Sequence, residues 1–282
     1  MVPEVLDFRI TAQCALRCPF CFGATAVQQM DMTVLRRFLA FMQAQGLKYV
    51  VLTGGEPTQS PIFKEVLEIL QSLGLAAALS TNGLFWPDEE LRSMIFSACQ
   101  WISFPVESSI AEVHNHMRRC TLDHYSLIHS ILEQIRSMAP GVKLKIGTVA
   151  AKENAASIPS LLDTLPVQPD VWRLFQLSRS EKNTMYYEKQ HLDDRTFGDL
   201  IHGLKARYQE HPTKIQTSYD RERDGRYLFL EPDGLLKTIK DGQDFVIGQY
   251  ADIGPDLIHR IETSVDDKRT NMNFFNSFGA PQ

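Results

Sequence analysis

Short apolar runs alternate with longer segments of helix-like apolar spacing from residue 6 to residue 177. The runs predict six strands, at Leu6–Ile10, Tyr49–Leu52, Ala76–Leu79, Trp101–Pro105, Val142–Val149 and Val171–Leu177. Between the strands, apolar side chains recur every three or four residues, as at Leu35, Leu39 and Met42. The pattern therefore predicts six strand–helix units in succession.

Several predicted helix ends carry local signals of their own. Asp31 is placed to cap the first helix, and Ser60-Pro61 marks the start of the second. Gly74 is expected to close that second helix. A longer helix is predicted over residues 122–138.

Strands that alternate with helices form parallel sheets, because the chain crosses back through each helix before the next strand begins. Six units predict an α/β fold, an open and partial (β/α)6 barrel over residues 1–178. Barrels of this kind carry their chemistry at the carboxyl ends of the strands. Residues 179–282 are expected to form a C-terminal extension that packs on the barrel, in a position to close its active site.

The extension has more charged loops than the barrel segment. A helix is predicted over residues 196–208. The strands Tyr227–Leu230 and Leu235–Ile239 flank Pro232-Asp233-Gly234, in which proline presets φ and glycine accepts a positive φ, so a β-hairpin is expected. The Asn-rich tail, residues 271–282, carries three phenylalanines and either covers the barrel or packs on its side.

Composition narrows the class of protein. With 282 residues, 44% hydrophobic and 22% charged, the chain has the composition of a globular protein, and disorder is excluded. A formal net charge of -5 argues against nucleic acid or a membrane surface as partner, so any phosphate site must be local. The start of the chain lacks the pattern of a signal peptide, and no segment approaches the roughly 20 apolar residues of a membrane span. A reducing cytoplasm is the expected location.

Three of the five cysteines, Cys14, Cys18 and Cys21, lie within eight residues after the first strand. At this chain's cysteine frequency, chance is a poor explanation for the spacing C-x3-C-x2-C. Three thiolates can ligate three irons of a four-iron cluster and leave the fourth iron open. A structural zinc site, which would want a fourth protein ligand, stays an alternative. Cys99 and Cys120 are expected to be buried core thiols.

Two further motifs follow the next two strands, Gly54-Gly55-Glu56-Pro57 and Ser80-Thr81-Asn82-Gly83. Together with the cysteine spacing, they resemble the radical S-adenosylmethionine (SAM) enzymes, over at least residues 6–176. The resemblance implies a 4Fe-4S cluster on the three cysteines and SAM as cofactor. It also implies that an electron donor such as flavodoxin or ferredoxin reduces the cluster.

The resemblance also implies roles at the strand ends. The Gly-Gly-Glu-Pro segment, Gly54, Gly55, Glu56 and Pro57, would receive the methionyl ammonium of SAM. Ser80, Thr81 and Asn82 would hold its ribose or carboxylate, and Glu107 and Arg118 are further candidate contacts. Cleavage of SAM then gives a 5'-deoxyadenosyl radical that removes a hydrogen from the substrate. His114 and His116 fit either a His-x3-Arg segment common in this family or plain surface histidines.

Four further segments are similar to viperins, the radical SAM nucleotide dehydratases. They are Phe20-Cys21-Phe22, Leu144-Lys145-Ile146, residues 171–176 (VWRLFQ) and residues 226–231 (RYLFLE). One departure is clear: Gly23-Ala24-Thr25-Ala26 stands where viperins carry His-Thr-Ala-Lys, so one phosphate-binding lysine is missing.

The viperin resemblance implies a set of substrate contacts. Lys145, Arg173 and one of Arg118 or Arg119 would bind the phosphates of a nucleoside triphosphate. Tyr227 would lie near the sugar and is the candidate catalytic side chain, and Asp7 stands where viperins have Asn. The alternative is that these cations are solvated or pair with Glu107 and Asp170.

The leading hypothesis is therefore a dehydratase that removes the C4' hydrogen of a ribonucleotide and the 3'-hydroxyl, giving a 3'-deoxy-3',4'-didehydro nucleotide. Antiviral defence is the setting that the resemblance implies. A second hypothesis keeps the radical SAM chemistry but takes a sugar, nucleoside or peptide in a biosynthetic pathway. A third is a non-catalytic zinc-binding protein.

Overall fold

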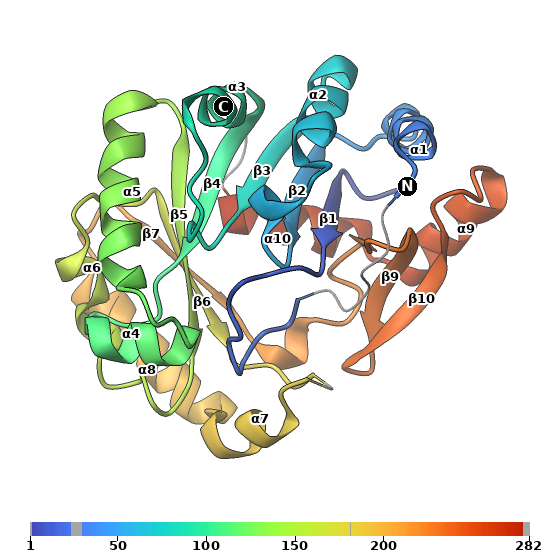
Figure 1. Cartoon of the computed structure of the whole chain (residues 1–282). Helices are drawn as coiled ribbons and strands as arrows, with labels where there is room; N and C mark the ends of the chain where they lie inside the picture. The colour runs from blue at the N-terminus through green and yellow to red at the C-terminus, as the bar shows by residue number, and fades with distance from the viewer. Residues whose placement is uncertain (1, 24–29, 181, 279–282) are drawn as a thin grey trace.

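The computed structural model describes residues 2–23, 30–180 and 182–278, with side chains as far as Met272 (Figure 1). One ten-stranded sheet organises this part of the chain, in the order β10-β9-β8-β1-β2-β3-β4-β5-β6-β7. The strands are β1 (Val5–Thr11), β2 (Tyr49–Gly54), β3 (Ala76–Ser80), β4 (Cys99–Pro105), β5 (Lys143–Ala150), β6 (Val171–Gln176), β7 (Lys214–Ser218), β8 (Phe229–Leu230), β9 (Leu235–Lys240) and β10 (Gln243–Gln249). The first six pair in parallel and in chain order, which confirms the predicted α/β architecture.

Helices follow most of the parallel strands. They are α1 (Met32–Ala44), α2 (Phe63–Leu73), α3 (Glu89–Ala98), α4 (Ala111–Arg118), α5 (His124–Met138), α6 (Leu161–Thr164), α7 (Thr184–Gln190), α8 (Asp194–Arg207), α9 (Pro255–Ser264) and α10 (Asp267–Phe278). Short 3-10 helices lie at Pro57–Gln59, Ile158–Ser160 and Asp220–Glu222. Within the described residues, no helix combines the length and apolarity needed to cross a membrane.

Local signals set most of the helix ends. The Asp31 carboxylate accepts hydrogen bonds from the backbone N–H groups of Thr33 and Val34 at the start of α1, as predicted. Gly74 ends α2 with φ 67°, also as predicted. The expected start of α2 at Ser60-Pro61 is wrong, because Pro57–Gln59 forms its own 3-10 turn and α2 begins at Phe63.

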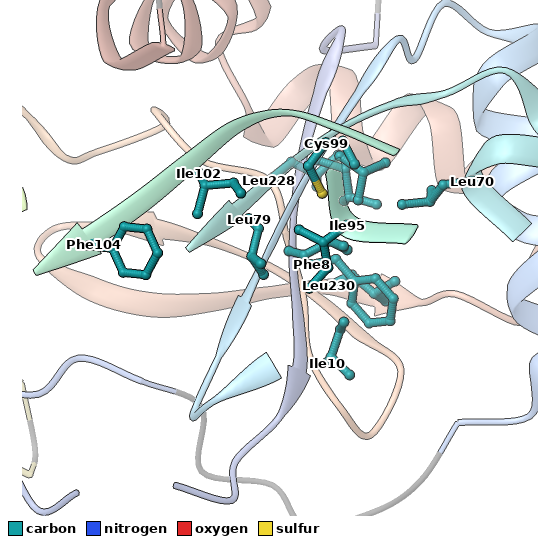
Figure 2. Packing of buried hydrophobic residues seen from close by; sticks show 14 of the residues in the cluster. Phe8, Ile10, Leu70, Leu79, Ile95, Cys99, Ile102, Phe104, Leu228 and Leu230 are labelled. Atoms are coloured by element: carbon teal, nitrogen blue, oxygen red, sulfur yellow. The ribbon is translucent and has the colours of Figure 1, made fainter. Parts of the chain in front are cut away.

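Alternate residues of each strand point to opposite sides of the sheet. On β1, Leu6, Phe8 and Ile10 are buried in the hydrophobic core shared with the helices. Figure 2 shows Phe8 and Ile10 in this core, which also contains Leu79 of β3 and Ile102 of β4. The intervening residues face the concave side of the sheet, which is where the polar chemistry collects.

The two remaining cysteines occupy different environments. Cys99 is buried in the same core, where burial raises the pKa of its thiol to about 12, and the core-thiol prediction is confirmed there. For Cys120 that prediction is wrong, because its side chain is half-buried and lines a surface hollow next to His116 and Arg119.

Residues after 178 extend both edges of the sheet. β7 pairs in parallel with β6, and β8 pairs in parallel with β1. β8 and β9 form the predicted hairpin, and β10 adds a third strand that the apolar pattern did not predict. β7, Lys214–Ser218, reads KIQTS and has no apolar run, and β10, Gln243–Gln249, reads QDFVIGQ and has only the three-residue run Phe245-Val246-Ile247. Segments on the two sides of residue 178 therefore share one sheet.

The tail helix α10 lies across the concave side (Figure 1). It contacts β1 at one end of the arc of strands and β5 and β6 at the other. Near the start of β1, the backbone N–H of Glu4 donates to Asn271 Oδ1 at 2.8 Å. The backbone of α10 thus covers the barrel interior, whereas the side chains of Phe274, Phe275 and Phe278 lie outside the described residues.

Candidate active site

A cavity of about 430 Å³ opens on the concave side and at the carboxyl ends of the strands. Side chains from β1 to β7 and from the loops that follow them line it, and Thr270 of α10 lies at its edge. This is the location predicted from the strand–helix pattern. Of the predicted site residues, all line the cavity except Glu56, Pro57 and Arg119.

The glycine pair after β2 holds the cysteine loop against the sheet. The N–H groups of Gly55 and Glu56 donate to the carbonyls of Thr11 and Gln13, at 2.6 and 2.7 Å. A Cβ on Gly55 would overlap the carbonyl oxygen of Gln13, and Gly54 has φ 131°. Both positions therefore need glycine, and their backbone places the chain just before Cys14.

The three loop thiols Cys14, Cys18 and Cys21 all line the cavity. Asn82 Nδ2 donates to Cys14 Sγ at 3.4 Å, and the backbone N–H of Gly23 donates to Cys21 Sγ at 3.2 Å. Burial raises the pKa of Cys14 and takes the pKa of Cys18 to about 11, so both are thiols at neutral pH until a metal displaces the protons.

This donor set fits an iron–sulfur cluster. N–H donors to the cysteine sulfurs are among the groups that set the reduction potential of such clusters. Two of the three sulfurs, those of Cys14 and Cys21, have such a donor. The largely buried guanidinium of Arg118 adds a positive charge beside the same thiols. Across the described residues, no three Cys, His or acidic side chains converge on a point suited to one metal ion. In a four-iron cluster the cysteines bind to different irons, so they need not converge in this way.

Glu56 is buried and joins the ends of β2 and β3. Its carboxylate accepts hydrogen bonds from both the backbone and the hydroxyl of Thr58, from Thr81 Oγ1 at 2.6 Å and from the Asn82 N–H at 2.7 Å. Pro57, next to it, is also buried and starts the 3-10 turn. Glu56 therefore shapes the strand ends rather than lining the cavity.

Glu107, which is buried, and Arg118, which is largely buried, form an ion pair at the cavity wall. Arg118 Nη1 lies 3.2 Å from Glu107 Oε1, and the other carboxylate oxygen accepts from the Val149 N–H at 2.8 Å. Burial raises the pKa of Glu107 despite the neighbouring guanidinium. Arg118 Nε has no hydrogen-bond partner among the described residues, and the guanidinium lies 5.7 Å from the Phe20 ring centre.

Asp7, Lys145 and Arg173 meet on the concave face, from β1, β5 and β6. Lys145 and Arg173 are nearly fully buried. Burial lowers the pKa of Lys145 well below its usual value, and the charge of Arg173 adds to that effect. Burial also raises the pKa of Asp7 to about 6, against the opposing effect of Arg9 and the two other cations. The three residues predicted from the sequence as substrate contacts thus form a cluster of charged groups in the cavity.

Asp170, which the alternative interpretation paired with these cations, lies elsewhere. Its carboxylate is 3.3 Å from Arg136 Nη2 and 3.3 Å from Lys143 Nζ. The predicted contact Arg119 is also remote: it is exposed at the end of α4 with φ 50° and lines the separate surface hollow. Between the two candidate arginines, the structure therefore places Arg118 in the cavity.

Sequence reasoning missed two cavity arginines, Arg9 and Arg223. Arg9 is buried, 2.6 Å from Glu231 Oε1, and its guanidinium lies 4.0 Å from the ring centre of Phe229. Arg223 lies 3.9 Å from the ring centre of Phe22. The two-residue period from Asp7 could have identified Arg9 as inward-facing, whereas no pattern marks Arg223 in its loop.

Aromatic rings complete the side of the cavity next to the hairpin. Tyr227 stacks on Phe229 with ring centres 5.1 Å apart and planes 10° apart, and both line the cavity. The predicted sugar-side tyrosine therefore does face the same space as Lys145 and Arg173.

His114 is not a surface histidine. Its ring is fully buried and hydrogen-bonded to His124, also fully buried, with 2.8 Å between His114 Nε2 and His124 Nδ1. His116, by contrast, is exposed on the other side of α4.

Residues 8–143 match the family model of the radical SAM superfamily. This match covers just under half of the chain and supports its resemblance to the radical SAM superfamily. Radical SAM enzymes use a 4Fe-4S cluster and SAM, so the match favours this cofactor pair over the zinc-binding alternative.

Relatives within the superfamily differ in what they act on. The chain is 27% identical over 165 residues to a PqqA peptide cyclase of Methylobacterium nodulans, covering 57% of this chain and 43% of that protein. It is 22% identical over 166 residues to a GTP 3',8-cyclase of Chlorobaculum tepidum, covering 57% of this chain and 49% of that protein. The chain thus matches less than half the length of either radical SAM relative.

The fold agrees with that of solved radical SAM enzymes. SuiB of Streptococcus suis bound to S-adenosylmethionine aligns with a TM-score of 0.72 at 14% identity, covering 96% of this chain and 68% of SuiB. The parallel core with antiparallel strands added near the C-terminus is therefore a radical SAM architecture.

Proposed function

We propose that the chain is a radical SAM dehydratase of the viperin type, acting on a ribonucleotide in the cytoplasm. One observation carries the proposal: Lys145 and Arg173 reach, from adjacent strands, the same cavity that the three loop thiols line. The relative named GTP 3',8-cyclase supports a nucleotide, and the four segments similar to viperins support the dehydration.

In this proposal Cys14, Cys18 and Cys21 hold the cluster. SAM lies against the strand ends formed by Gly54, Gly55, Ser80, Thr81 and Asn82, with Glu107 after the neighbouring strand β4 and Arg118 paired to it. Arg118 Nε, which lacks a hydrogen-bond partner among the described residues, is available to a carboxylate. When bound, the cluster and SAM supply a hydrogen-abstracting radical.

Lys145 and Arg173 would hold the phosphates. Burial lowers the pKa of Lys145, and a nearby polyanion would raise it again, because a negative charge favours the protonated ammonium group. Arg223 supplies a further cation next to Phe22, which directly follows the third cysteine. Phe22 is close in sequence to the position where viperins carry the lysine that this chain lacks. Arg223, which lies next to Phe22, would therefore compensate for the missing lysine.

The reaction balances with two electrons from a donor such as flavodoxin or ferredoxin, one used in forming the radical from SAM and one used on the substrate. Removal of the C4' hydrogen leaves a carbon radical on the ribose. Loss of the 3'-hydroxyl as water takes up one proton, and one electron then completes the 3'-deoxy-3',4'-didehydro nucleotide. Tyr227 and Phe229 flank the sugar in this arrangement and exclude water from it.

The test is an anaerobic assay of reconstituted protein with SAM, dithionite and, separately, CTP, UTP, GTP or ATP. We expect one nucleotide to stimulate 5'-deoxyadenosine formation and to yield a product lighter by one water. Iron and sulfide analysis of the same sample establishes the cluster. Cleavage of SAM that no nucleotide stimulates would refute the dehydratase.

Variants test the phosphate site. Lys145→Ala and Arg173→Ala should each raise the nucleotide KM by about tenfold or more, because each removes a buried charged contact. Lys143→Ala is the matched control, since Lys143 is on the same strand but pairs with Asp170 outside the cavity. Unchanged KM in both cavity variants contradicts this placement of the phosphates.

A peptide substrate is the second candidate, and the relative named PqqA peptide cyclase favours it. A peptide would need the cavity to be open to a chain passing through its mouth. The same assay separates the two candidates, because nucleotides would leave SAM cleavage unchanged while a precursor peptide from the neighbouring genes would stimulate it.

A further inference from the structure

We propose that His114 and His124 are positioning residues that hold the Asn82 side-chain amide on the Cys14 sulfur and thereby raise the reduction potential of the cluster. The inference rests on the proposed ligation of the cluster by Cys14. It concerns two buried histidines that the proposed reaction does not use.

The two histidines form a continuous hydrogen-bonded chain between two strand ends. The backbone N–H of Glu107, after β4, lies 3.0 Å from His114 Nδ1. His114 Nε2 lies 2.8 Å from His124 Nδ1, and His124 Nε2 lies 2.7 Å from the carbonyl oxygen of Asn82, after β3. Both rings have no exposed surface, and their planes are within 13° of each other.

The ends of this chain fix the direction of every hydrogen bond. A backbone N–H can only donate, so His114 Nδ1 carries no proton and His114 Nε2 does. That proton is donated to His124 Nδ1, which leaves the proton of His124 on Nε2. A carbonyl can only accept, and Asn82 supplies that acceptor. One tautomer of each neutral ring satisfies all three contacts.

The surroundings keep both rings neutral. Burial and the positive charge of Arg118 lower the pKa of His114 to about 2 and that of His124 to about 4. Asp123 opposes the shift of both rings, and His129 adds to that of His114. The hydrogen bonds that link the two histidines therefore persist at neutral pH.

The hydrogen-bonded chain of histidines ends at Asn82. Its backbone N–H donates to Glu56 Oε2 at 2.7 Å, while its backbone carbonyl accepts from His124. Its side-chain oxygen accepts from the Leu84 N–H at 2.8 Å, so the NH2 group must be the one facing Cys14 Sγ at 3.4 Å. Every polar group of Asn82 thus has a partner, and the histidines hold its backbone carbonyl.

This placement has a redox consequence. N–H donors to the cysteine sulfurs stabilise the reduced, more negative cluster and raise its potential. The Asn82 amide is such a donor only while the Asn82 peptide keeps its orientation. Loss of the hydrogen bond from His124 frees the Asn82 carbonyl to turn, and the amide then leaves the sulfur.

The test is a redox titration of the anaerobically reconstituted protein, followed by electron paramagnetic resonance without SAM or substrate. We expect His124→Phe and Asn82→Leu each to lower the midpoint potential, and the double variant to lower it no further than Asn82→Leu alone. His124→Gln, whose amide reaches the position of Nε2, should restore most of the potential. His129→Phe, on the same helix but outside the chain, is the matched control and should leave it unchanged.

The outcomes separate this inference from the proposed function. Additive shifts in the double variant, or no shift in Asn82→Leu, overturn it, and the second result holds even if His124→Phe does not fold. A wild-type protein that takes up no cluster overturns both this inference and the ligand assignment. A cluster that titrates as expected in a protein that turns over no nucleotide refutes only the dehydratase.

Discussion

At the scale of single residues, two kinds of constraint determine which residue occupies a position in the site. Some positions are fixed by space, as at Gly55, where any side chain meets the backbone of the cysteine loop. Others are fixed by charge, as at Asp7, whose carboxylate lies among three cations and is nevertheless raised in pKa by burial. Each kind gives a separate prediction.

Gly55→Ala should destabilise the fold by about 2 kcal/mol and reduce cluster uptake, because the new Cβ displaces the chain that leads to Cys14. Urea unfolding of the apoprotein and iron analysis after reconstitution measure the two effects. Gly141→Ala, at a position with open space around it, is the control and should change neither. Normal stability of Gly55→Ala would contradict the close approach.

Asp7→Asn should change how stability depends on pH. The folded-state pKa of Asp7, about 6, lies above its ordinary value of 3.8, so the folded protein holds the proton more tightly than the unfolded chain. The wild type therefore loses stability as pH rises from about 4 to about 6, by roughly 1–2 kcal/mol, and the variant does not. Unfolding at pH 4, 5, 6 and 7 compares them; parallel curves would contradict the raised pKa.

At the scale of elements, the strand ends are joined by buried polar groups. Glu56 joins β2 to β3 through Thr81 and Asn82, and the histidine chain joins β3 to β4. Carboxyl ends of parallel strands lack ladder partners beyond the last pair, and these contacts provide them. Glu56, His114 and His124 thus hold the ends of β2, β3 and β4 in place, although none of the three lines the cavity.

Glu56→Gln should destabilise the protein by about 2 kcal/mol, because an amide cannot replace a carboxylate that accepts on both oxygens. Chemical unfolding measures the loss. Glu90→Gln is the control, since that side chain is exposed in a surface pair with Lys64 and should cost little. Equal effects of the two substitutions would mean that Glu56 does not organise the strand ends.

At the scale of the whole molecule, the first strand depends on the C-terminal segment. β8 pairs with β1, and the buried Arg9–Glu231 pair spans 222 residues of sequence. α10 then crosses the concave side against β1, β5 and β6. The cavity is therefore complete only when both halves of the chain are folded together.

Arg9→Met should cost about 3–5 kcal/mol, because it leaves the Glu231 carboxylate buried without its partner. Arg9→Met combined with Glu231→Leu should recover most of that loss, since neither charge then remains. Urea unfolding of the single and double variants measures the coupling. A double variant as unstable as Arg9→Met alone would show that packing, not charge, dominates at this contact.

Local order along the chain specifies the strands and the inward-facing side chains. The two-residue alternation on each strand is enough to place Asp7, Lys145 and Arg173 on one face of the sheet. The cysteine spacing lies within one loop, and the positions of the motifs at the next two strand ends follow from the parallel order. These features could be predicted because they need only neighbours in the chain.

Contacts between distant residues decide the rest of the site, and only the folded chain shows them. They place Arg223 in the cavity, keep Arg119 out of it, and turn Glu56 away from the cavity toward Thr81. They also create β7 and β10, whose sequences have no apolar run or only a short one and become strands because an existing sheet edge offers them hydrogen bonds. The physical reason is the same in each case. These groups are stabilised by contacts with residues far away in the sequence, and no local pattern can specify those residues.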